Sequence, residues 1–393
     1  SLGDRGRISE AARLVRIAAE GNRVAVVASA VGGVTNRLAA LIERAMEPEV
    51  DWTEEVECIG RQHLQTLEAL SPGTGEPAAD TIRDILESLR LDLGTLAGHP
   101  LERAEISDRV LAVGERLSVQ LLAAAIRTAG CAARVVDGSE LVVTDSTFGE
   151  AVVDFAGTRD RCQRVLKGRD EAVFVVTGFI GADQYGRTTT LGRGGSDYSA
   201  AVVGASIDAE RVEIWTDVDG VLTAPPKLVP SVSSIPWLSY EEAAELSFFG
   251  ATVLHPRTVR PLAERGIPIL VRNTFEPDRR GTEVASRTGA ASRVVAVSAH
   301  EDVRVLRLRA GFPGFEGDVL MSCRASSDGS TLVAVSDHRA RRLIEEFRGD
   351  EGLPLEHHFP ASIITLVGHD IALQPWVAGR ALESLARRNI AVH

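Results

Sequence analysis

The chain has 393 residues, of which 44% are hydrophobic and 25% are charged. This length exceeds what one hydrophobic core usually serves, so we expect two or three domains. The composition is close to that of soluble domains and excludes wholesale disorder, a collagen-like chain and a coiled coil. The net charge of −12 argues against a general electrostatic grip on nucleic acid or on an anionic membrane.

The sequence carries no targeting signal and no metal-binding pattern. No uninterrupted apolar run approaches the ~20 residues of a membrane-spanning helix, and the N-terminus lacks the basic-then-apolar pattern of a secretory signal. We therefore expect a cytoplasmic protein. The histidines lack zinc-binding spacing and the cysteines form no C-x-x-C pair, so neither structural zinc nor a disulfide framework is expected. The cysteines are Cys58, Cys131, Cys162 and Cys323.

The first half of the chain alternates between helical stretches and short apolar strands. Residues 8–20 and 115–129 have apolar positions at helical spacing, and each stretch is followed by a strand. Continuous apolar strands are typical of a sheet covered on both faces, so we predict an α/β fold with a mostly parallel sheet sandwiched by helices. The expected strands are 24–29, 133–136, 171–179 and 211–217.

Two regions differ from this alternation. Residues 52–104 contain long amphipathic stretches interrupted by a Ser/Pro/Gly/Thr segment at 71–77, and we interpret them as a helical insertion. At 276–293 the apolar periodicity dissolves into charged and small residues, which predicts a domain boundary. We therefore expect one domain over 1–285 and a second region over 286–393.

The C-terminal region has the pattern of a small α+β structure. We interpret it as one α+β unit followed by the first half of another, with a further strand beginning at Ile390. The expected strands are 303–309, 319–325, 331–336 and 362–368, and the expected helices are 338–348 and 376–388.

The strongest chemical signal is the glycine-rich segment TLGRGGSDYSAAVVGA (190–205), which follows a strand and opens a helix at Ser196. Glycines let backbone N–H groups approach an anion, and a helix N-terminus adds a favourable dipole. Ser196 can cap the helix and donate to a phosphate oxygen, and Arg193 supplies a planar fork that suits a carboxylate. A capped glycine-rich turn without a ligand is the alternative, since such motifs are weak alone.

Two further segments have the same sequence of strand, glycine and helix. WTDVDGVLTAPPK places Asp217 and Asp219 around a tight turn at Gly220, at the carboxyl end of a strand where ligands of open sheets collect. ASAVGGVTNRL has a double glycine followed by Thr35 and Asn36 as a helix cap. Three such loops at one sheet edge favour a binding site over three unrelated turns.

A carboxylate stands in the segment VGERLSVQLLAAAIRTAG, where Glu115 lies at an expected helix N-terminus beside Arg116. It can cap the helix and be stabilised by the helix dipole, or it can hold a substrate ammonium group. Both interpretations stay open on these residues alone.

Six motifs follow one another in a distinctive order: SAVGGVTN, GERLS, GRGGSDYSAA, WTDVDGVLTA, SYEEAAELSFFGATVLHPRTV, and RNTFEP with a later GT. In this order and spacing they resemble the aspartate kinase family, within the amino acid kinase fold, over roughly residues 2–285. The tail resembles the paired ferredoxin-like ACT domains usual in that family. The resemblance implies transfer of the γ-phosphoryl group of ATP to the side-chain carboxylate of L-aspartate, in the biosynthesis of lysine, threonine and related amino acids.

The resemblance also implies a role for each matching residue. Arg193 would grip the α-carboxylate of aspartate and Glu115 its ammonium group. Mg²⁺ bound with ATP would neutralise much of the phosphate charge, and no protein ligand to the metal is assigned. The catalytic residues would be Arg193, Ser196 and Asp197, and the substrate site would add Thr35, Asn36 and Gly194. The ATP site would comprise Ser29, Gly195, Ser196, Thr216, Asp217, Asp219, Gly220, Leu222 and Lys227.

The sequence departs from the family pattern at three places. Family members begin with a strand ending in Lys-Phe-Gly-Gly-Thr, whose lysine bridges ATP phosphates, whereas this sequence starts at Ser1, where that motif should have ended. Thr252 stands where the family has a lysine, and Pro225 and Lys227 alter its T-A-D-P-R motif. The link 311–318 is too short for the helix that should cross the first ACT sheet.

Two alternatives to a working aspartate kinase follow from these departures. One is a non-catalytic, aspartate-kinase-like regulatory or partner subunit, suggested by the missing lysine motif and by Thr252. The other is a kinase of the same fold that acts on another amino acid. The short link removes one wall of the usual effector pocket, so we expect the activity to respond little to lysine or threonine. We also expect a homodimer formed through the ACT-like region.

Overall fold

The structure, a computed structural model, describes the chain in eight segments that form two compact units. The segments are 2–47, 50–167, 173–249, 254–286, 293–309, 319–324, 330–347 and 355–392. The first unit comprises Ser1–Val221, Pro236–Tyr240 and Val253–Ser286, and the second comprises Leu222–Ile235, Glu241–Thr252 and Arg287–His393. Thr252 and the link 311–318 lie outside the described residues.

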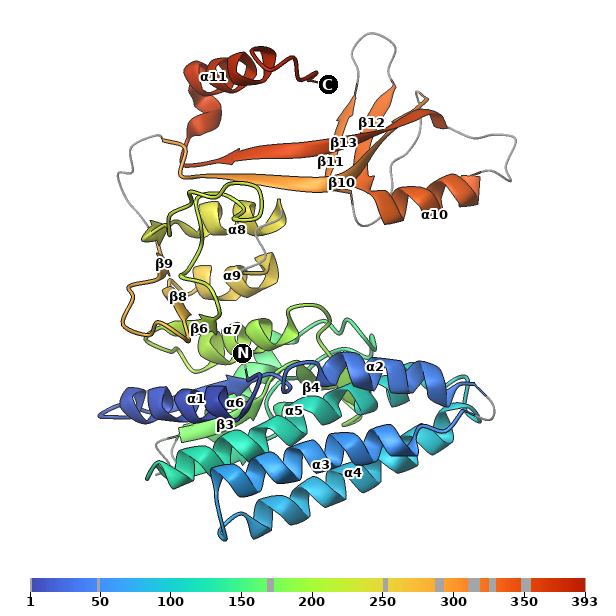
Figure 1. Cartoon of the computed structure of the whole chain (residues 1–393), viewed down its shortest axis with the longest axis vertical. Helices are drawn as coiled ribbons and strands as arrows, with labels where there is room; N and C mark the ends of the chain where they lie inside the picture. The colour runs from blue at the N-terminus through green and yellow to red at the C-terminus, as the bar shows by residue number, and fades with distance from the viewer. Residues whose placement is uncertain are drawn as a thin grey trace. The chain divides into compact units, whose positions relative to one another are not determined.

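The first unit is built from helices and short strands (Figure 1). Its helices are α1 (Arg5–Ala18), α2 (Val34–Ala45), α3 (Thr53–Leu70), α4 (Glu76–Leu96), α5 (Arg103–Thr128), α6 (Phe155–Leu166), α7 (Gly195–Ser206) and α9 (Pro256–Ala263), with a 3-10 turn at Gly138–Glu140. Its strands are β1 (Val24–Ala28), β2 (Ala133–Val136), β3 (Val173–Thr177), β4 (Ile180–Ala182), β5 (Thr188–Thr190), β6 (Val212–Thr216), β7 (Trp237–Leu238), β8 (Ile269–Asn273) and β9 (Thr282–Val284).

The strands of the first unit form two main sheets and a hairpin. One sheet has the order β1-β3-β2 and is entirely parallel. The other has the order β6-β8-β9-β7, in which β8 and β9 are antiparallel and the remaining pairs are parallel. β4 and β5 form the antiparallel hairpin. The predicted α/β fold with a mostly parallel sheet is confirmed, although the described strands divide that sheet into two.

Helices cover both faces of the β1-β3-β2 sheet. Val173 and Val175 of β3 pack into a core that includes α1 and α5, whereas Phe174 and Val176 pack into a core that includes α7. All five residues of β3 are buried, which explains why its sequence is a continuous apolar run.

Helices α3, α4 and α5 lie side by side as a bundle (Figure 1). They hold together because apolar side chains recur every three or four residues along α4, at Ile82, Leu86, Leu89, Leu93 and Leu96, and are all buried. The stretch 52–104 is thus largely helical, with breaks at 71–75 and 97–102. The helix predicted at 115–129 is the second half of α5, which begins at Arg103.

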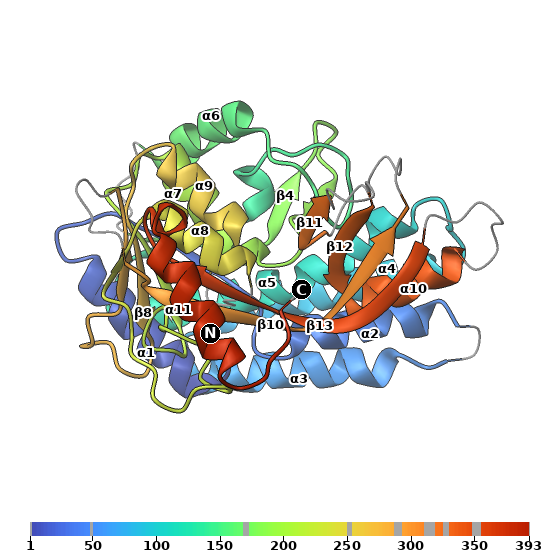
Figure 2. The same cartoon turned by 90° about the horizontal axis from the view of Figure 1, so that it is seen from above.

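The elements of the second unit are β10 (Ala296–Leu308), β11 (Met321–Arg324), β12 (Thr331–Ser336), β13 (Leu355–Val367), α8 (Tyr240–Phe248), α10 (Asp337–Phe347), α11 (Pro375–Ala386) and a 3-10 turn at Ile371–Leu373. Its antiparallel sheet has the order β11-β12-β10-β13, and Figure 2 shows β10 and β13 running side by side. Leu343 of α10 packs against Leu306 and Val333 of this sheet. The strand predicted at 362–368, which was expected to open a second ACT-like unit, belongs to β13 and shares the sheet of β10. Residues 390–392, where a further strand was expected, form no strand.

None of the helices in the described part of the chain combines the length and the apolar content that a membrane span requires.

Candidate functional site

The predicted loops gather at the carboxyl ends of the parallel strands in the first unit. The N–H of Gly178, after β3, donates to the carbonyl of Ala28 at the end of β1. The N–H of Thr274, after β8, donates in the same way to the carbonyl of Thr216 at the end of β6. This edge of an open α/β sheet is where ligands bind.

The glycine-rich loop starts α7 through glycine geometry. Gly194 is the N-cap residue, with a φ of 70° in the left-handed region, and the helix begins at Gly195 without a side-chain cap. The prediction that Ser196 caps this helix is therefore wrong. A β-carbon on Gly195 would lie 2.6 Å from the ring of Phe179, so only glycine fits there without a shift.

The loop after β3 fixes the position of this helix start. Phe179 has a φ of 66°, which is unusual for a residue with a side chain. Its backbone N–H donates to Ser199 Oγ at 2.9 Å, and its carbonyl accepts from the N–H of Leu191 at 2.9 Å. The backbone N–H groups near Gly194 are thereby held in place before any ligand binds.

The loop after β1 opens α2 in the same manner. Gly33, with a φ of 83°, is the N-cap residue, and α2 begins at Val34. Thr35 and Asn36 consequently lie in the first turn rather than at the cap, which corrects the sequence prediction. Thr35 is half-buried and Asn36 is exposed. Neither side chain caps the helix, because Gly33 forms the turn at its start.

Glu115 lies in the middle of α5, not at a helix N-terminus as the sequence suggested. Its side chain is 3% exposed, and Oε1 accepts a hydrogen bond of 3.1 Å from the backbone N–H of Ala30. Oε2 is buried and has no hydrogen-bond partner among the described residues. Burial disfavours the charged form and raises the pKa of Glu115 to about 7. The neighbouring Arg116 pairs with Asp137 at 2.7 Å.

Four of the predicted catalytic and ATP-site residues line one cavity of about 620 Å³, namely Ser29, Ser196, Asp197 and Thr216. Burial raises the pKa of the Asp197 carboxyl above its ordinary value. In the described ranges, no group of three or more His, Cys, Asp and Glu side chains is arranged to hold a metal ion. Thr274 also lines this cavity, and sequence reasoning missed it.

Arg193 is exposed in the glycine-rich loop and has no hydrogen bond or ion pair within the described segments. Near it stands His255, whose ring lies within van der Waals distance of the position a β-carbon on Gly194 would take. His255 caps α9, because its Nδ1 accepts from the N–H of Arg257 at 3.2 Å. Burial, together with the charges of Arg257 and Arg193, lowers the pKa of His255. His255 belongs to one of the six sequence motifs, but nothing in the sequence indicated that it lies beside Gly194.

The two aspartates of the TDVDG turn differ in their surroundings. Asp217 is exposed, and Thr216 Oγ1 lies 3.2 Å from its carboxylate. Asp219 is half-buried and accepts a hydrogen bond of 2.7 Å from Asn273 as well as pairing with Arg279. Asp219 therefore holds the turn, whereas Asp217 is available to a ligand.

The remaining predicted nucleotide residues are placed as follows. Gly220 is buried in the turn, with a φ of 104°. Leu222 is half-buried and Lys227 is exposed, and both belong to the second unit. Their assignment to the nucleotide stays a prediction from the sequence.

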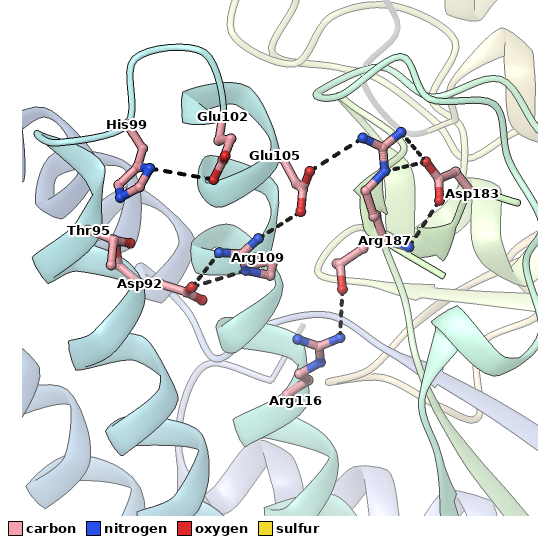
Figure 3. A network of polar contacts seen from close by, with 10 residues as sticks. Asp92, Thr95, His99, Glu102, Glu105, Arg109, Arg116, Asp183 and Arg187 are labelled. Atoms are coloured by element: carbon pink, nitrogen blue, oxygen red, sulfur yellow. Dashed lines mark hydrogen bonds and ion pairs between the residues drawn. The ribbon is translucent and has the colours of Figure 1, made fainter. Parts of the chain in front are cut away.

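A chain of ion pairs holds the β4–β5 hairpin against the bundle (Figure 3). Arg109 pairs with Asp92 at 2.7 Å and with Glu105 at 3.0 Å, Glu105 pairs with Arg187 at 3.5 Å, and Arg187 pairs with Asp183 at 2.6 Å. The hairpin ends at Thr190 and leads directly into the glycine-rich loop, so this network anchors the loop to α4 and α5.

Asp108 connects α5 directly to the strand that leads into that loop. It is 2% exposed, and its Oδ2 accepts from the backbone N–H groups of Thr190 at 2.7 Å and of Gly149 at 2.9 Å. Its Oδ1 accepts from Thr190 Oγ1 at 2.9 Å. Burial raises the pKa of Asp108. No motif in the sequence marked this residue.

Comparisons with known proteins agree with this architecture. The family model described as "Amino acid kinase family" matches residues 1–273. Bifunctional aspartokinase/homoserine dehydrogenase 2, chloroplastic, of Arabidopsis thaliana is 30% identical over 430 residues, covering 100% of this chain and 46% of the relative. Lysine-sensitive aspartokinase 3 of Escherichia coli is 36% identical over 267 residues, covering 67% of this chain and 58% of the relative. The chain thus spans about half the length of the curated relatives it matches.

One solved structure is similar over nearly the whole chain. It is E. coli aspartokinase III in complex with aspartate and ADP, with a TM-score of 0.82 and 27% sequence identity. The match covers 98% of this chain and 89% of that one.

Proposed function

Because the chain belongs to the amino acid kinase family, we propose that it transfers the γ-phosphoryl group of ATP to the side-chain carboxylate of L-aspartate. Relatives named as aspartokinases, and a similar structure described as a complex with aspartate and ADP, support this choice within the family. The product would be 4-phospho-L-aspartate.

The observation that carries the proposal is the second oxygen of Glu115. This Oε2 is buried beside the loop after β1 and has no described partner, although a buried carboxylate oxygen without one is costly. A substrate ammonium group would supply the missing donors and a compensating charge. Glu115 is therefore proposed to bind the α-ammonium group of aspartate.

Arg193 is proposed to bind the α-carboxylate of the same substrate. Its guanidinium is exposed and unpaired within the described residues, and it lies in a loop whose backbone is already fixed. A guanidinium can form two parallel hydrogen bonds with a carboxylate. Thr35, Asn36 and Gly194 would complete the substrate site.

The phosphates are proposed to lie along Ser29, Gly195 and Ser196, with the adenosine at the turn that contains Asp217. Ser29 and Ser196 line the same cavity, and the start of α7 offers backbone N–H groups to an anion. In this arrangement Asp219 and Gly220 hold the turn in its conformation and do not contact the adenosine themselves.

Mg²⁺ fits this site as a companion of ATP, because Mg²⁺ usually binds through one or two carboxylates together with substrate phosphates. Asp197, the carboxylate that lines the cavity in the first turn of α7, would hold it. When bound, the ion neutralises phosphate charge. The protein's own task is to align the two substrates. A side-chain oxygen of aspartate forms a bond to the γ-phosphorus while the bond from that phosphorus to the bridging oxygen breaks, and ADP leaves.

A homodimer formed through residues 286–393 and a cytoplasmic location stay predictions from the sequence. Both concern the protein that contains this chain.

The experiment is a hydroxylamine trap. An acyl phosphate reacts with hydroxylamine to give a hydroxamate and phosphate, so colour with iron(III) reports phosphorylation of a carboxylate. The protein that contains this chain is incubated with ATP, Mg²⁺ and L-aspartate, L-glutamate or N-acetyl-L-glutamate in parallel. Hydroxamate from L-aspartate alone supports the proposal, and its loss in Glu115→Ala ties the activity to this site. Hydroxamate from another substrate, or from none, would refute it.

A further inference from the structure

The start of α2 is bonded to helix α3 through the side chain of Arg37. Its Nε donates to Glu55 Oε1 at 2.5 Å, and its Nη1 donates to Gln62 Oε1 at 2.7 Å. Glu55 and Gln62 stand about two turns apart on α3, so the planar guanidinium bridges two positions of that helix. All three side chains are half-buried, which reduces the screening of the pair by salt.

Arg37 stands at a position where a positive charge is unfavourable. It is the fourth residue of α2, and the helix dipole is positive at the N-terminus, so a cation is repelled there. The carboxylate of Glu55 offsets this repulsion. A basic side chain at this position therefore stabilises the contact between the two helices and not α2 itself.

The other contacts of this helix start give it little direction. Gly33 forms the cap without a side-chain hydrogen bond. The apolar face of α2 packs into the core through Val34, Leu38 and Leu41. Apolar contacts are non-directional, so they hold the helix against the core without fixing its rotation. The two hydrogen bonds from the charged Arg37 guanidinium supply that direction.

This anchor adjoins the residues proposed to seat the substrate. Thr35 and Asn36 directly precede Arg37 in the first turn of α2. Thr35 lies about 200° around the helix from Arg37, so the two side chains leave α2 on nearly opposite sides. At the other end of the same loop, Glu115 accepts from the N–H of Ala30. The segment between β1 and α2 is thus fixed at both ends.

We infer that Arg37 is a positioning residue for the amino-acid substrate, because its contacts with α3 set the orientation of the first turn of α2. That turn presents Thr35 and Asn36 to the substrate site. The inference rests on the proposed function for the identity of the substrate, aspartate. Its structural part, that Arg37 fixes the start of α2, is measured without substrate, so the two fail separately.

The kinetic test compares Arg37→Ala with Arg44→Ala, which removes the same side chain from the last turn of the same helix, where it is exposed. Arg37→Ala is expected to raise the aspartate KM about tenfold and to change the ATP KM by less than about twofold, because α2 contains no residue of the predicted ATP site. Arg44→Ala is expected to leave both KM values unchanged. An unchanged aspartate KM in Arg37→Ala, or equal rises in both KM values, would overturn the inference.

A charge swap separates positioning from a general loss of structure. Arg37→Glu places two carboxylates face to face, so it should raise the aspartate KM more than Arg37→Ala does. Adding Glu55→Arg rebuilds the pair in the opposite direction and should return this KM to within about threefold of the unsubstituted value. A double variant no better than Arg37→Glu would contradict the inference. Glu55→Gln, which keeps the size of the side chain, replaces Arg37→Ala if that variant does not fold, and a rise in the aspartate KM alone is again expected.

Hydrogen exchange tests the structural part by itself. Peptides covering residues 30–41 are expected to exchange about tenfold faster in Arg37→Ala and at an unchanged rate in Arg44→Ala. Faster exchange without a change in the aspartate KM would refute the positioning role, and unchanged exchange would refute the anchor. If the unsubstituted protein makes no hydroxamate from L-aspartate, the proposed function fails, and the exchange rates still decide whether Arg37 fixes the start of α2.

Discussion

Asp108 and Glu115 lie seven residues apart on α5, so that they stand two turns apart on nearly the same face of the helix. Each is buried, and each fixes a different loop of the site. Asp108 holds the strand that leads into the glycine-rich loop, and Glu115 holds the loop after β1. Helix α5 therefore sets the distance between the two loops proposed to bind the substrate.

Asp108 is a positioning residue, and Asp108→Asn should show this in the kinetics. The substitution leaves one acceptor oxygen for three donors, namely two backbone N–H groups and the Thr190 hydroxyl, so we expect a loss of about 1–3 kcal/mol of stability. Because Thr190 leads to Arg193, the aspartate KM should rise while the ATP KM changes little. Asp80→Asn, which removes an exposed pair with Arg83, is the control. Equal rises in the KM values for aspartate and ATP would instead indicate that the substitution loosens the whole fold.

Aspartate binding should weaken as pH falls below about 7, because the pKa of Glu115 in the empty protein is raised to about 7 by burial. The ammonium group requires the ionised form, so a bound proton must leave when aspartate binds below that pH. Apparent affinity should then fall up to about tenfold per pH unit. Calorimetric titrations in two buffers of different ionisation enthalpy measure the released proton, and Glu115→Gln should abolish this release. Release that persists in the variant would assign the proton to another group.

The same pKa predicts how stability changes with pH. In the folded protein the pKa of Glu115 lies above its ordinary value of 4.5, so the fold binds the proton more tightly than the unfolded chain does. The stability contributed by this proton is fully present below pH 4.5 and is lost as pH rises toward 7. The Tm difference between the unsubstituted protein and Glu115→Gln should therefore shift across this window, as scanning calorimetry can measure. A Tm difference that stays constant from pH 4.5 to 7 would show that burial does not raise the pKa of the Glu115 carboxyl.

Arg193→Ala should lower kcat/KM for aspartate by about 2–4 kcal/mol, as expected for the loss of a charge-assisted contact made by two hydrogen bonds. ATP affinity should change far less. Arg193→Lys keeps the charge without the planar fork and should recover only part of the loss. Steady-state kinetics with each substrate varied in turn measure both effects. Near-normal aspartate kinetics in Arg193→Ala would remove this residue from the substrate site.

Asp217→Ala and Asp219→Ala should separate binding from structure in the TDVDG turn. Asp217 is exposed, so its loss should weaken nucleotide binding without lowering Tm. Asp219 bonds Asn273 and pairs with Arg279, so its loss should lower both Tm and nucleotide affinity. Calorimetric titration with a non-hydrolysable ATP analogue, beside thermal melts, gives the two readouts. An unchanged affinity in Asp217→Ala would move the adenosine elsewhere.

The sequence predicted the parallel strands and the glycine-rich loops because both depend on local patterns. β3 is apolar throughout since it is buried on both faces, and Gly194 is needed for a left-handed turn. The helix starts were placed wrongly because glycine, not serine or threonine, forms the caps, as at Gly33. The roles of Asp108 and His255 depend on contacts between residues far apart in the chain, which no local pattern contains.

The substitution Gly114→Ala tests whether α5 sets the geometry of the substrate site. A β-carbon on Gly114 would lie 2.8 Å from the β-carbon of Ala30, so the helix touches the loop after β1 at this glycine. Gly114→Ala should push the loop away and lengthen the hydrogen bond between Ala30 and Glu115. We expect a loss of about 1–3 kcal/mol of stability from overpacking and a higher aspartate KM.

The matched control for Gly114→Ala is Gly94→Ala in α4, where nothing lies within 4 Å of the added carbon. This change should raise stability by about 0.5–1 kcal/mol, because alanine loses less backbone entropy than glycine on entering a helix, and it should leave the aspartate KM unchanged. Chemical denaturation and steady-state kinetics on both variants measure these opposite signs. If Gly114→Ala proved as stable as Gly94→Ala with an unaltered KM, the contact between α5 and the loop would not govern substrate binding.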